Sequence, residues 1–282
     1  MDDLETLATL LTKPEPSTEA ITRSRSRLQD RMRGRARRRI GWLVPGVGLA
    51  TAAAAVVAVI ATGVTTPDGA PVSGREVLLM AAASAERTPQ DSGTYWYVRS
   101  EWSDPEIPAM ESWTRRDGRR WTKGEPGDPP GVAVPTPLPL SLKGAEVSFE
   151  DLEGLPTDPE ALKARITERK GHANDMSRSE QRGDPLFPLL SLISELPTPS
   201  EVRSAAFRAL ATTPGVESRG AVEGGQELLI PNPEGGQEIK LVVDPETARV
   251  TRTNYLLSGD GNVAGTDEFI SVTTNWTDQP PR

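Results

Sequence analysis

Residues 40–64, IGWLVPGVGLATAAAAVVAVIATGV, form an apolar run without a single ionisable side chain. A helix of about 20 apolar residues is long enough to cross the hydrocarbon core of a bilayer. Because lipid offers the backbone no hydrogen-bond partners, a segment that spans it has to be helical. Trp42 lies where an interfacial aromatic anchor is expected. The run therefore predicts one transmembrane helix between a short leader, residues 1–39, and a long second part.

The charges on either side of this run predict its orientation. Nine arginines lie within residues 23–39 against one acid, Asp30, whereas the first basic residue beyond the run is Arg75. Basic residues stay on the cytoplasmic side, so we expect a single-pass protein of the cell membrane with a cytoplasmic N-terminus and the rest outside. The residues nearest the run are predicted to set this topology and to contact lipid headgroups of the bilayer: Arg35, Arg37, Arg38 and Arg39.

A cleaved signal peptide and a twin-arginine signal both fit the apolar run less well. A cleaved signal peptide has an apolar region of about 7–15 residues, shorter than this one, and no leader of this length before it. The pair Arg38-Arg39 is similar to a twin-arginine signal, but it belongs to a general arginine tract and the residues that follow fit poorly. The sequence favours a signal-anchor.

The leader is too short to bury a core of its own. Leu4, Leu7 and Leu11 follow the spacing of a short amphipathic helix. Residues 1–39 therefore either lie on the membrane, dock in the groove of a cytoplasmic regulatory partner, or remain a poorly ordered tail. Their net charge is +4, and that of residues 65–282 is −12. We expect no nucleic-acid partner, because binding one would require the arginine tract to leave the membrane surface.

Composition argues against most catalytic chemistry. The chain has no cysteine and one histidine, His172, so disulfides, thiolate metal sites and cysteine nucleophiles are excluded and structural zinc nearly so. A serine triad would need His172 as its base, yet His172 lies in a polar stretch without a nucleophile motif around it. No glycine-rich phosphate loop follows a strand. We expect a protein that is not an enzyme and holds no cofactor or metal, with a hydrolase as the weakest alternative.

The second part begins with a polar linker, residues 65–74, and a domain predicted over residues 75–282. A helix is expected over residues 75–87, followed by a strand in TYWYVRSEW, where side chains alternate between two faces. One face carries Trp96, Val98 and Trp102. These three are the predicted ligand-facing residues, on the concave side of a sheet that would bind an apolar ligand.

The stretch ESWTRRDGRRWTK predicts a β-hairpin with a two-residue turn at Asp117-Gly118. That register pairs Arg116 with Arg119 and Arg115 with Arg120, so four arginines would crowd one tip. The tip is either solvated and neutralised by neighbouring acids, or it contacts an anionic surface of lipid headgroups or an acidic partner.

The remaining sequence predicts helices and then strands. Residues 124–140 hold six prolines and are expected to be a loop. Three helices are expected to begin at Asp158-Pro159, at Asp184-Pro185 and at Thr198, where Thr198 and Glu201 would form a capping box. Strands are expected within residues 225–231, 237–244, 249–258 and 268–276, with a turn at 244–247. Without strand–helix–strand alternation, the fold class is α+β, with a curved antiparallel sheet and packed helices.

Three stretches carry a resemblance to a known family: GLPTDPEALKARI, SEVRSAAFRALATTPGV and LVVDPETARV. Together with the leader, arginine tract and apolar run, they resemble actinobacterial single-pass membrane proteins of unknown function, some encoded beside extracytoplasmic-function sigma factors. The chain departs from that pattern at Ala248, where glycine is expected. The outer domain is also similar to the half-open barrels of lipoprotein carriers and anti-sigma-factor regulators, a likeness of fold that implies little about function.

Two functions are consistent with these features. The first is a membrane-anchored, non-enzymatic sensor or accessory regulator, whose outer domain binds a ligand or an envelope partner while the leader contacts a cytoplasmic protein. The second is a tethered carrier of a lipid or other apolar ligand.

Overall fold

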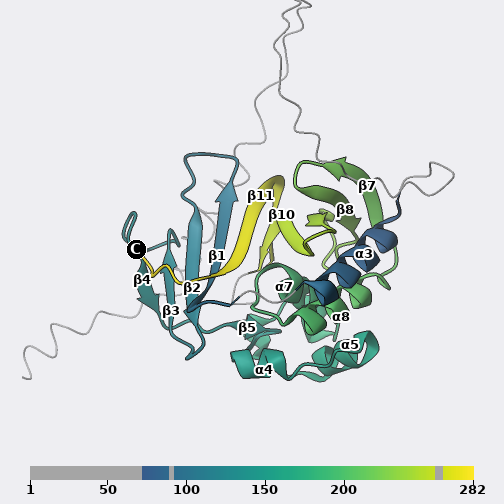
Figure 1. Cartoon of the computed structure of the whole chain (residues 1–282), viewed down its shortest axis with the longest axis horizontal. Coiled ribbons are helices and arrows are strands. Elements are labelled where there is room, and N and C mark those ends of the chain that lie inside the picture. The colour runs from purple at the N-terminus through teal and green to yellow at the C-terminus, as the bar shows by residue number, and fades with distance from the viewer. Residues whose placement is uncertain (1–71, 89–91, 258–262) are drawn as a thin grey trace, which may run out of the picture. The chain divides into compact units, whose positions relative to one another are not determined.

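The computed structural model describes residues 72–88, 92–257 and 263–282 of the chain (Figure 1). The leader 1–39 with its four topology arginines, the predicted span 40–64 and most of the linker 65–74 lie outside these residues. Within the ranges that are described, no helix has both the length and the apolar character needed to cross a membrane. The transmembrane helix therefore stays a prediction from the sequence.

The described residues are built around one nine-stranded antiparallel sheet. This confirms the expected α+β class with a large antiparallel sheet. In spatial order the strands are β4 (Val134–Thr136), β3 (Arg120–Lys123), β2 (Met110–Arg115), β1 (Tyr95–Trp102), β11 (Val263–Thr277), β10 (Arg249–Leu257), β9 (Ile239–Asp244), β8 (Gly225–Ile230) and β7 (Glu217–Val222). The first and last strands along the chain thus meet near the centre of the sheet, where β1 pairs with β11.

Helices pack against one part of this sheet. They are α3 (Gly74–Arg87), α4 (Phe149–Glu153), α5 (Pro159–Glu168), α6 (Arg178–Gln181), α7 (Leu186–Ser194) and α8 (Ser200–Leu210), with a 3-10 turn η1 (Ala173–Asp175) and a small hairpin of β5 (Ser141–Leu142) and β6 (Ala145–Glu146). Helices α3 and α7 both contact α8, and α3 and α7 reach strands of the β7–β10 part (Figure 1). The main apolar core lies there and includes Val77, Leu190, Phe207 and Leu241.

The predicted helix start is confirmed at Asp158-Pro159, whereas α7 and α8 each begin one residue later than predicted, with Pro185 and Pro199 as their N-cap residues. Asp158 caps α5 by accepting a hydrogen bond from the Ala161 N–H at 2.8 Å, and Asp184 accepts one from the Leu186 N–H at 2.9 Å. The capping box of Thr198 and Glu201 is not formed. Helix α8 begins at Ser200 with Pro199 as its N-cap residue, so Thr198 lies too far from the first turn, and its buried hydroxyl has no hydrogen-bond partner among the described residues.

The hairpin of β2 and β3 exists, but its predicted register is wrong. Trp113 pairs with Trp121 and Thr114 with Arg120, and the Arg115 N–H donates to the Arg119 carbonyl at 2.9 Å. The loop thus has three residues, 116–118, rather than two. Gly118 adopts φ +84°, a left-handed conformation that glycine enters without steric cost and that closes a three-residue loop.

Two further segments differ from the expectation in detail. The proline-rich loop 124–140 contains the short edge strand β4, where Pro135 is tolerated because an edge strand need not donate on both sides. Strand β11 begins at residue 263, five residues earlier than predicted. At the turn between β9 and β10, Ala248 has φ +54°, which explains why glycine is expected at this position.

Candidate functional site

A cavity of about 130 Å3 lies over the inner face of β1, β2 and β3. The register places Trp96 opposite Thr114, and Thr114 opposite Arg120, so these three side chains form one row across the sheet. Val98 and Ser112 form the next row. Because side chains two residues apart on a strand share a face, all five line the cavity from one side.

The C-terminal end of α7 and the segment 139–144 form the opposite wall, which includes Ser191, Glu195, Leu196 and Leu140. The indole Nε1 of Trp96 donates a hydrogen bond to the Glu195 carbonyl at 2.7 Å. This bond ties the end of α7 to β1 across 99 residues of sequence. The two walls of the cavity are therefore held at a defined separation.

Arg120 brings a positive charge into the cavity. Its Nε atom is buried and bonds no other described group. Burial lowers the pKa of the guanidinium, and the carboxylates of Glu125 and Glu195 oppose that effect. Arginine remains charged at any physiological pH, so an unmet donor here costs free energy that a ligand could recover.

Glu195 brings an acid to the opposite wall. Burial raises the pKa of its carboxyl to about 7, although the charge of Arg120 acts in the other direction. The carboxyl forms no ion pair with Arg120 within the part of the chain that the structure describes, even though the two groups attract one another. The pKa of Tyr255 is also raised, mainly by burial and to a smaller extent by the charge of Glu195.

Of the three other charged groups on the cavity wall, Lys143 and Glu180 have partners, whereas the Asp175 carboxylate forms no hydrogen bond or ion pair with the described residues. The Lys143 ammonium donates to the carbonyls of Ile166 and Thr167, at 2.9 and 2.6 Å, at the end of α5. The Glu180 carboxylate accepts from the Ser177 N–H at 2.7 Å in the capping box of α6. Both groups therefore hold the wall together, whereas Arg120 and Glu195 face the cavity without such bonds among the described residues.

The structure separates the three predicted ligand-facing residues. Trp96 and Val98 line the cavity, and Trp102 does not. Trp102 is the last residue of β1 and pairs with Ile270 of β11. The alternation of β1 correctly indicated a shared face, but nothing in the sequence near Glu195 showed that the end of α7 would lie over it.

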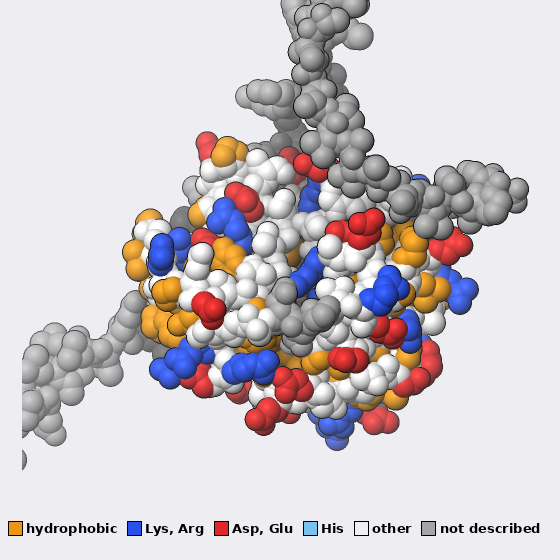
Figure 2. Space-filling model, in the orientation of Figure 1, with side chains coloured by type: hydrophobic (Ala, Val, Ile, Leu, Met, Phe, Trp, Pro, Cys, Tyr) orange, Lys and Arg blue, Asp and Glu red, His pale blue; other side chains and the backbone are white. Residues whose placement is uncertain are grey.

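The four hairpin arginines do not form one cluster. Arg120 faces the cavity, and Arg115 and Arg119 lie 3.5 and 2.8 Å from the Asp117 carboxylate. Arg116 pairs with Glu153 of α4 at 2.8 Å, and its guanidinium lies 5.0 Å from the Trp276 ring and 5.4 Å from the Phe149 ring. Basic and acidic side chains are interspersed over the face shown in Figure 2. Contact of these arginines with an anionic surface stays a prediction.

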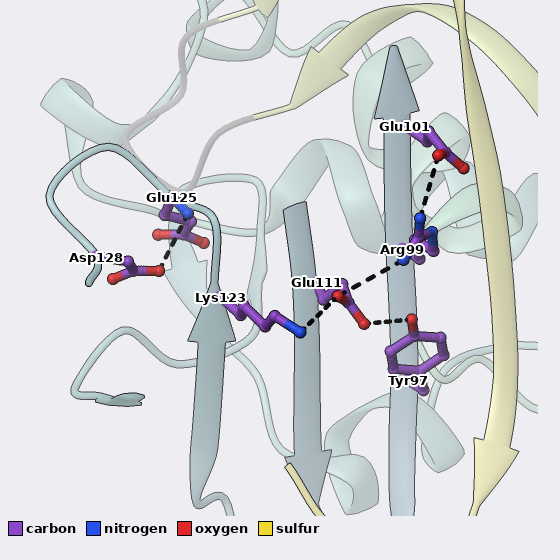
Figure 3. Close-up of polar contacts among 7 residues, drawn as sticks. All are labelled: Tyr97, Arg99, Glu101, Glu111, Lys123, Glu125 and Asp128. Carbon is purple, nitrogen blue, oxygen red and sulfur yellow. Dashed lines mark hydrogen bonds and ion pairs between the residues drawn. The ribbon is translucent and has the colours of Figure 1, made fainter. Parts of the chain in front are cut away.

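The opposite face of the same strands carries a polar cluster around Glu111 whose charges are paired (Figure 3). The Glu111 carboxylate accepts a hydrogen bond from the Tyr97 hydroxyl at 2.6 Å and lies 3.3 Å from the Lys123 ammonium and 3.6 Å from the Arg99 guanidinium. Burial and this hydrogen bond raise the pKa of Tyr97 to about 12. The cluster satisfies its own charges, so it offers a ligand little that it does not already have.

A second, more open hollow of about 480 Å3 lies between α6, the β8–β9 connection and β10. Its amide side chains bond the backbone around it: Asn232 donates to the Gln237 carbonyl, and Asn254 both accepts from the Lys240 N–H and donates to the Glu238 carbonyl. Its polar groups thus serve the local fold, and the smaller cavity remains the better candidate.

No group of three or more His, Asp or Glu residues suited to a metal ion occurs in the described ranges. His172 is exposed, and its backbone N–H donates to the Gly144 carbonyl at 2.8 Å. Comparisons with protein-family models, curated proteins and solved structures find no match for this chain.

Proposed function

We propose that the chain is a membrane-anchored, non-enzymatic sensor or accessory regulator, and that its outer domain binds a small ligand in the cavity between α7 and the β1–β3 strands. The apolar run 40–64 anchors it, and the leader 1–39 contacts a cytoplasmic partner. Binding outside is then reported inside through one polypeptide.

The observation that supports this function best is that Arg120 and Glu195, which carry opposite charges in the cavity, form no ion pair or hydrogen bond that would neutralise them within the described residues. The Arg120 Nε has no partner among the described groups, and burial raises the pKa of Glu195 to about 7. Leaving such groups buried costs about 1–3 kcal/mol each unless something satisfies them. Sites that bind ligands retain this kind of unmet polarity, whereas structural clusters such as that around Glu111 satisfy it internally.

The second function, carriage of a lipid, has less support. A ligand pocket for a molecule of drug size encloses roughly 300–1,000 Å3 and is mainly apolar. The cavity encloses about 130 Å3, and Ser112, Thr114, Arg120 and Glu195 supply much of its wall. An acyl chain would bury these polar groups against methylene carbons.

The experiment is cross-linking of the full chain in its native membranes, followed by capture and identification of the cross-linked proteins. We expect one cytoplasmic partner whose yield disappears when residues 2–32 are deleted, a deletion that keeps the arginines next to the apolar run. The yield should also change in the double variant Arg120→Gln, Glu195→Gln.

A matched control is the double variant Arg119→Gln, Glu168→Gln, which removes the same charges from exposed positions. Its capture should equal that of the unaltered chain. Capture that does not depend on the leader would contradict the proposed function.

A further inference from the structure

Charged side chains of opposite sign face one another from the two walls of the cavity. Arg120 lies on the sheet wall, and Glu195 lies on the α7 wall. Each influences the pKa of the other, yet no ion pair joins them in the described chain. The space between them is therefore electrostatically dipolar, positive at the sheet and negative at the helix end.

We propose that this cavity binds a small zwitterion of the amino-acid class, with its carboxylate on Arg120 and its ammonium on Glu195. The inference rests on the proposed function, because it names the ligand class of the same cavity. A guanidinium is the side chain best suited to a carboxylate, and a carboxylate accepts readily from an ammonium.

When Glu195 is ionised, charge balance disfavours simpler ligands. A monoanion would satisfy Arg120 and place a second negative charge near Glu195, whereas a monocation would satisfy Glu195 and face Arg120. Either would leave one charged group buried without a partner, which costs more than the bond it gains. A zwitterion satisfies both groups and adds no net charge to the cavity.

The size and the remaining wall fit the same class. A volume of about 130 Å3 lies well below the roughly 300–1,000 Å3 of a pocket for a molecule of drug size, so the ligand has to be small. Trp96, Val98, Leu140 and Leu196 provide an apolar wall between the charged groups. This wall would contact a short aliphatic side chain, and the hydroxyls of Ser112 and Ser191 remain for a polar one.

The experiment is isothermal titration calorimetry of the full chain in detergent micelles with three probes that differ by one charge each. Alanine carries both charges, propionate carries only the negative charge, and alaninamide carries only the positive charge. We expect saturable binding of alanine, with propionate and alaninamide weaker by about tenfold or more, because each loses one charged hydrogen bond.

Two variants test which residue holds which group. Arg120→Gln should weaken alanine and propionate but strengthen alaninamide, because the opposing positive charge is gone. Glu195→Gln should weaken alanine and alaninamide but strengthen propionate, because the opposing negative charge is gone. Each variant should still bind one of the three probes, and an unfolded variant would bind none. Loss of folding therefore cannot produce this pattern. The exposed variants Arg119→Gln and Glu168→Gln should bind all three probes as the unaltered chain does.

Protonation gives an independent readout. The titratable side chains around the cavity are Arg120, Lys143, Asp175, Glu180 and Glu195. An ammonium beside Glu195 favours its ionised form, so alanine binding near neutral pH should release protons, and Glu195→Gln should abolish that release.

Equal binding of alanine and propionate would overturn the zwitterion assignment, as would no saturable binding of any probe at millimolar concentration. If the probes fail while leader-dependent capture still responds to the cavity variants, the ligand class is wrong and the sensor function stands.

Discussion

Glu195 is the residue whose chemistry is most altered by the fold. Its carboxyl has a raised pKa because the end of α7 and the inner face of β1 shield it from much of the surrounding water. The backbone carbonyl of the same residue accepts a hydrogen bond from the Trp96 indole, which holds the end of α7 against β1. One residue therefore combines a structural contact with an acid that titrates near neutral pH.

We expect this pKa to make the domain less stable as pH rises. Between pH 4.5 and about 7 the folded state holds a proton on Glu195 that the unfolded state has lost, so the free energy of unfolding falls across this window. Because the residue keeps some exposure, the fall should be about 1–2 kcal/mol. Urea unfolding of the full chain in detergent, followed by tryptophan fluorescence, measures it.

The difference between unaltered protein and Glu195→Gln isolates this contribution, since burial raises the pKa of Glu125 and Glu180 as well. Glu195→Gln should flatten the pH dependence, and the exposed control Glu168→Gln should keep it. An unchanged slope in Glu195→Gln would show that Glu195 titrates normally.

Among the elements, the β2–β3 hairpin shows how one backbone conformation redistributes four side chains. A two-residue turn would have placed the arginines in opposed pairs. The three-residue loop instead puts Arg120 opposite Thr114 on the cavity face and lets Arg116 reach Glu153 and Trp276. The left-handed conformation of Gly118 is the cause.

Gly118→Ala should therefore destabilise the domain by about 1 kcal/mol, through the left-handed conformation rather than through a clash. A Cβ atom at this position would have no other atom within 4 Å. Gly118→Asn should cost less, because asparagine tolerates this conformation. Equal free energies of unfolding for both variants would show that the loop does not need φ above zero at this position.

At the scale of the whole molecule, the arrangement across the membrane is the property to test first. The chain has no cysteine, so single-cysteine variants report topology without a background. We expect a membrane-impermeant maleimide to label Ala221→Cys, an exposed position in the domain, on intact cells. Ser17→Cys in the leader should be labelled only after the membrane is permeabilised.

A cleaved or fully cytoplasmic chain would give a different pattern. Cleavage after the apolar run would release the labelled domain from the membrane fraction, and a cytoplasmic location would protect both cysteines. The cysteine-free parent is the matched control for labelling.

Local patterns were enough to predict the elements that depend on neighbouring residues. The spacing of Val77, Leu78 and Ala81 predicted α3, the alternation around Trp96 predicted β1, and Asp158-Pro159 predicted the start of α5. Each of these signals acts within one helical turn or one strand. The α+β class followed from their order along the chain.

The cavity depends on contacts that no local pattern contains. Trp96 and Glu195 meet although 99 residues separate them, and Arg120 joins them only because the hairpin loop has three residues rather than two. Strand register and helix packing are set by the free energy of the whole core, so single side chains can move from one face to the other without any change in local sequence. Local sequence patterns thus predict a membrane anchor and most of the elements, whereas long-range packing creates the candidate binding site.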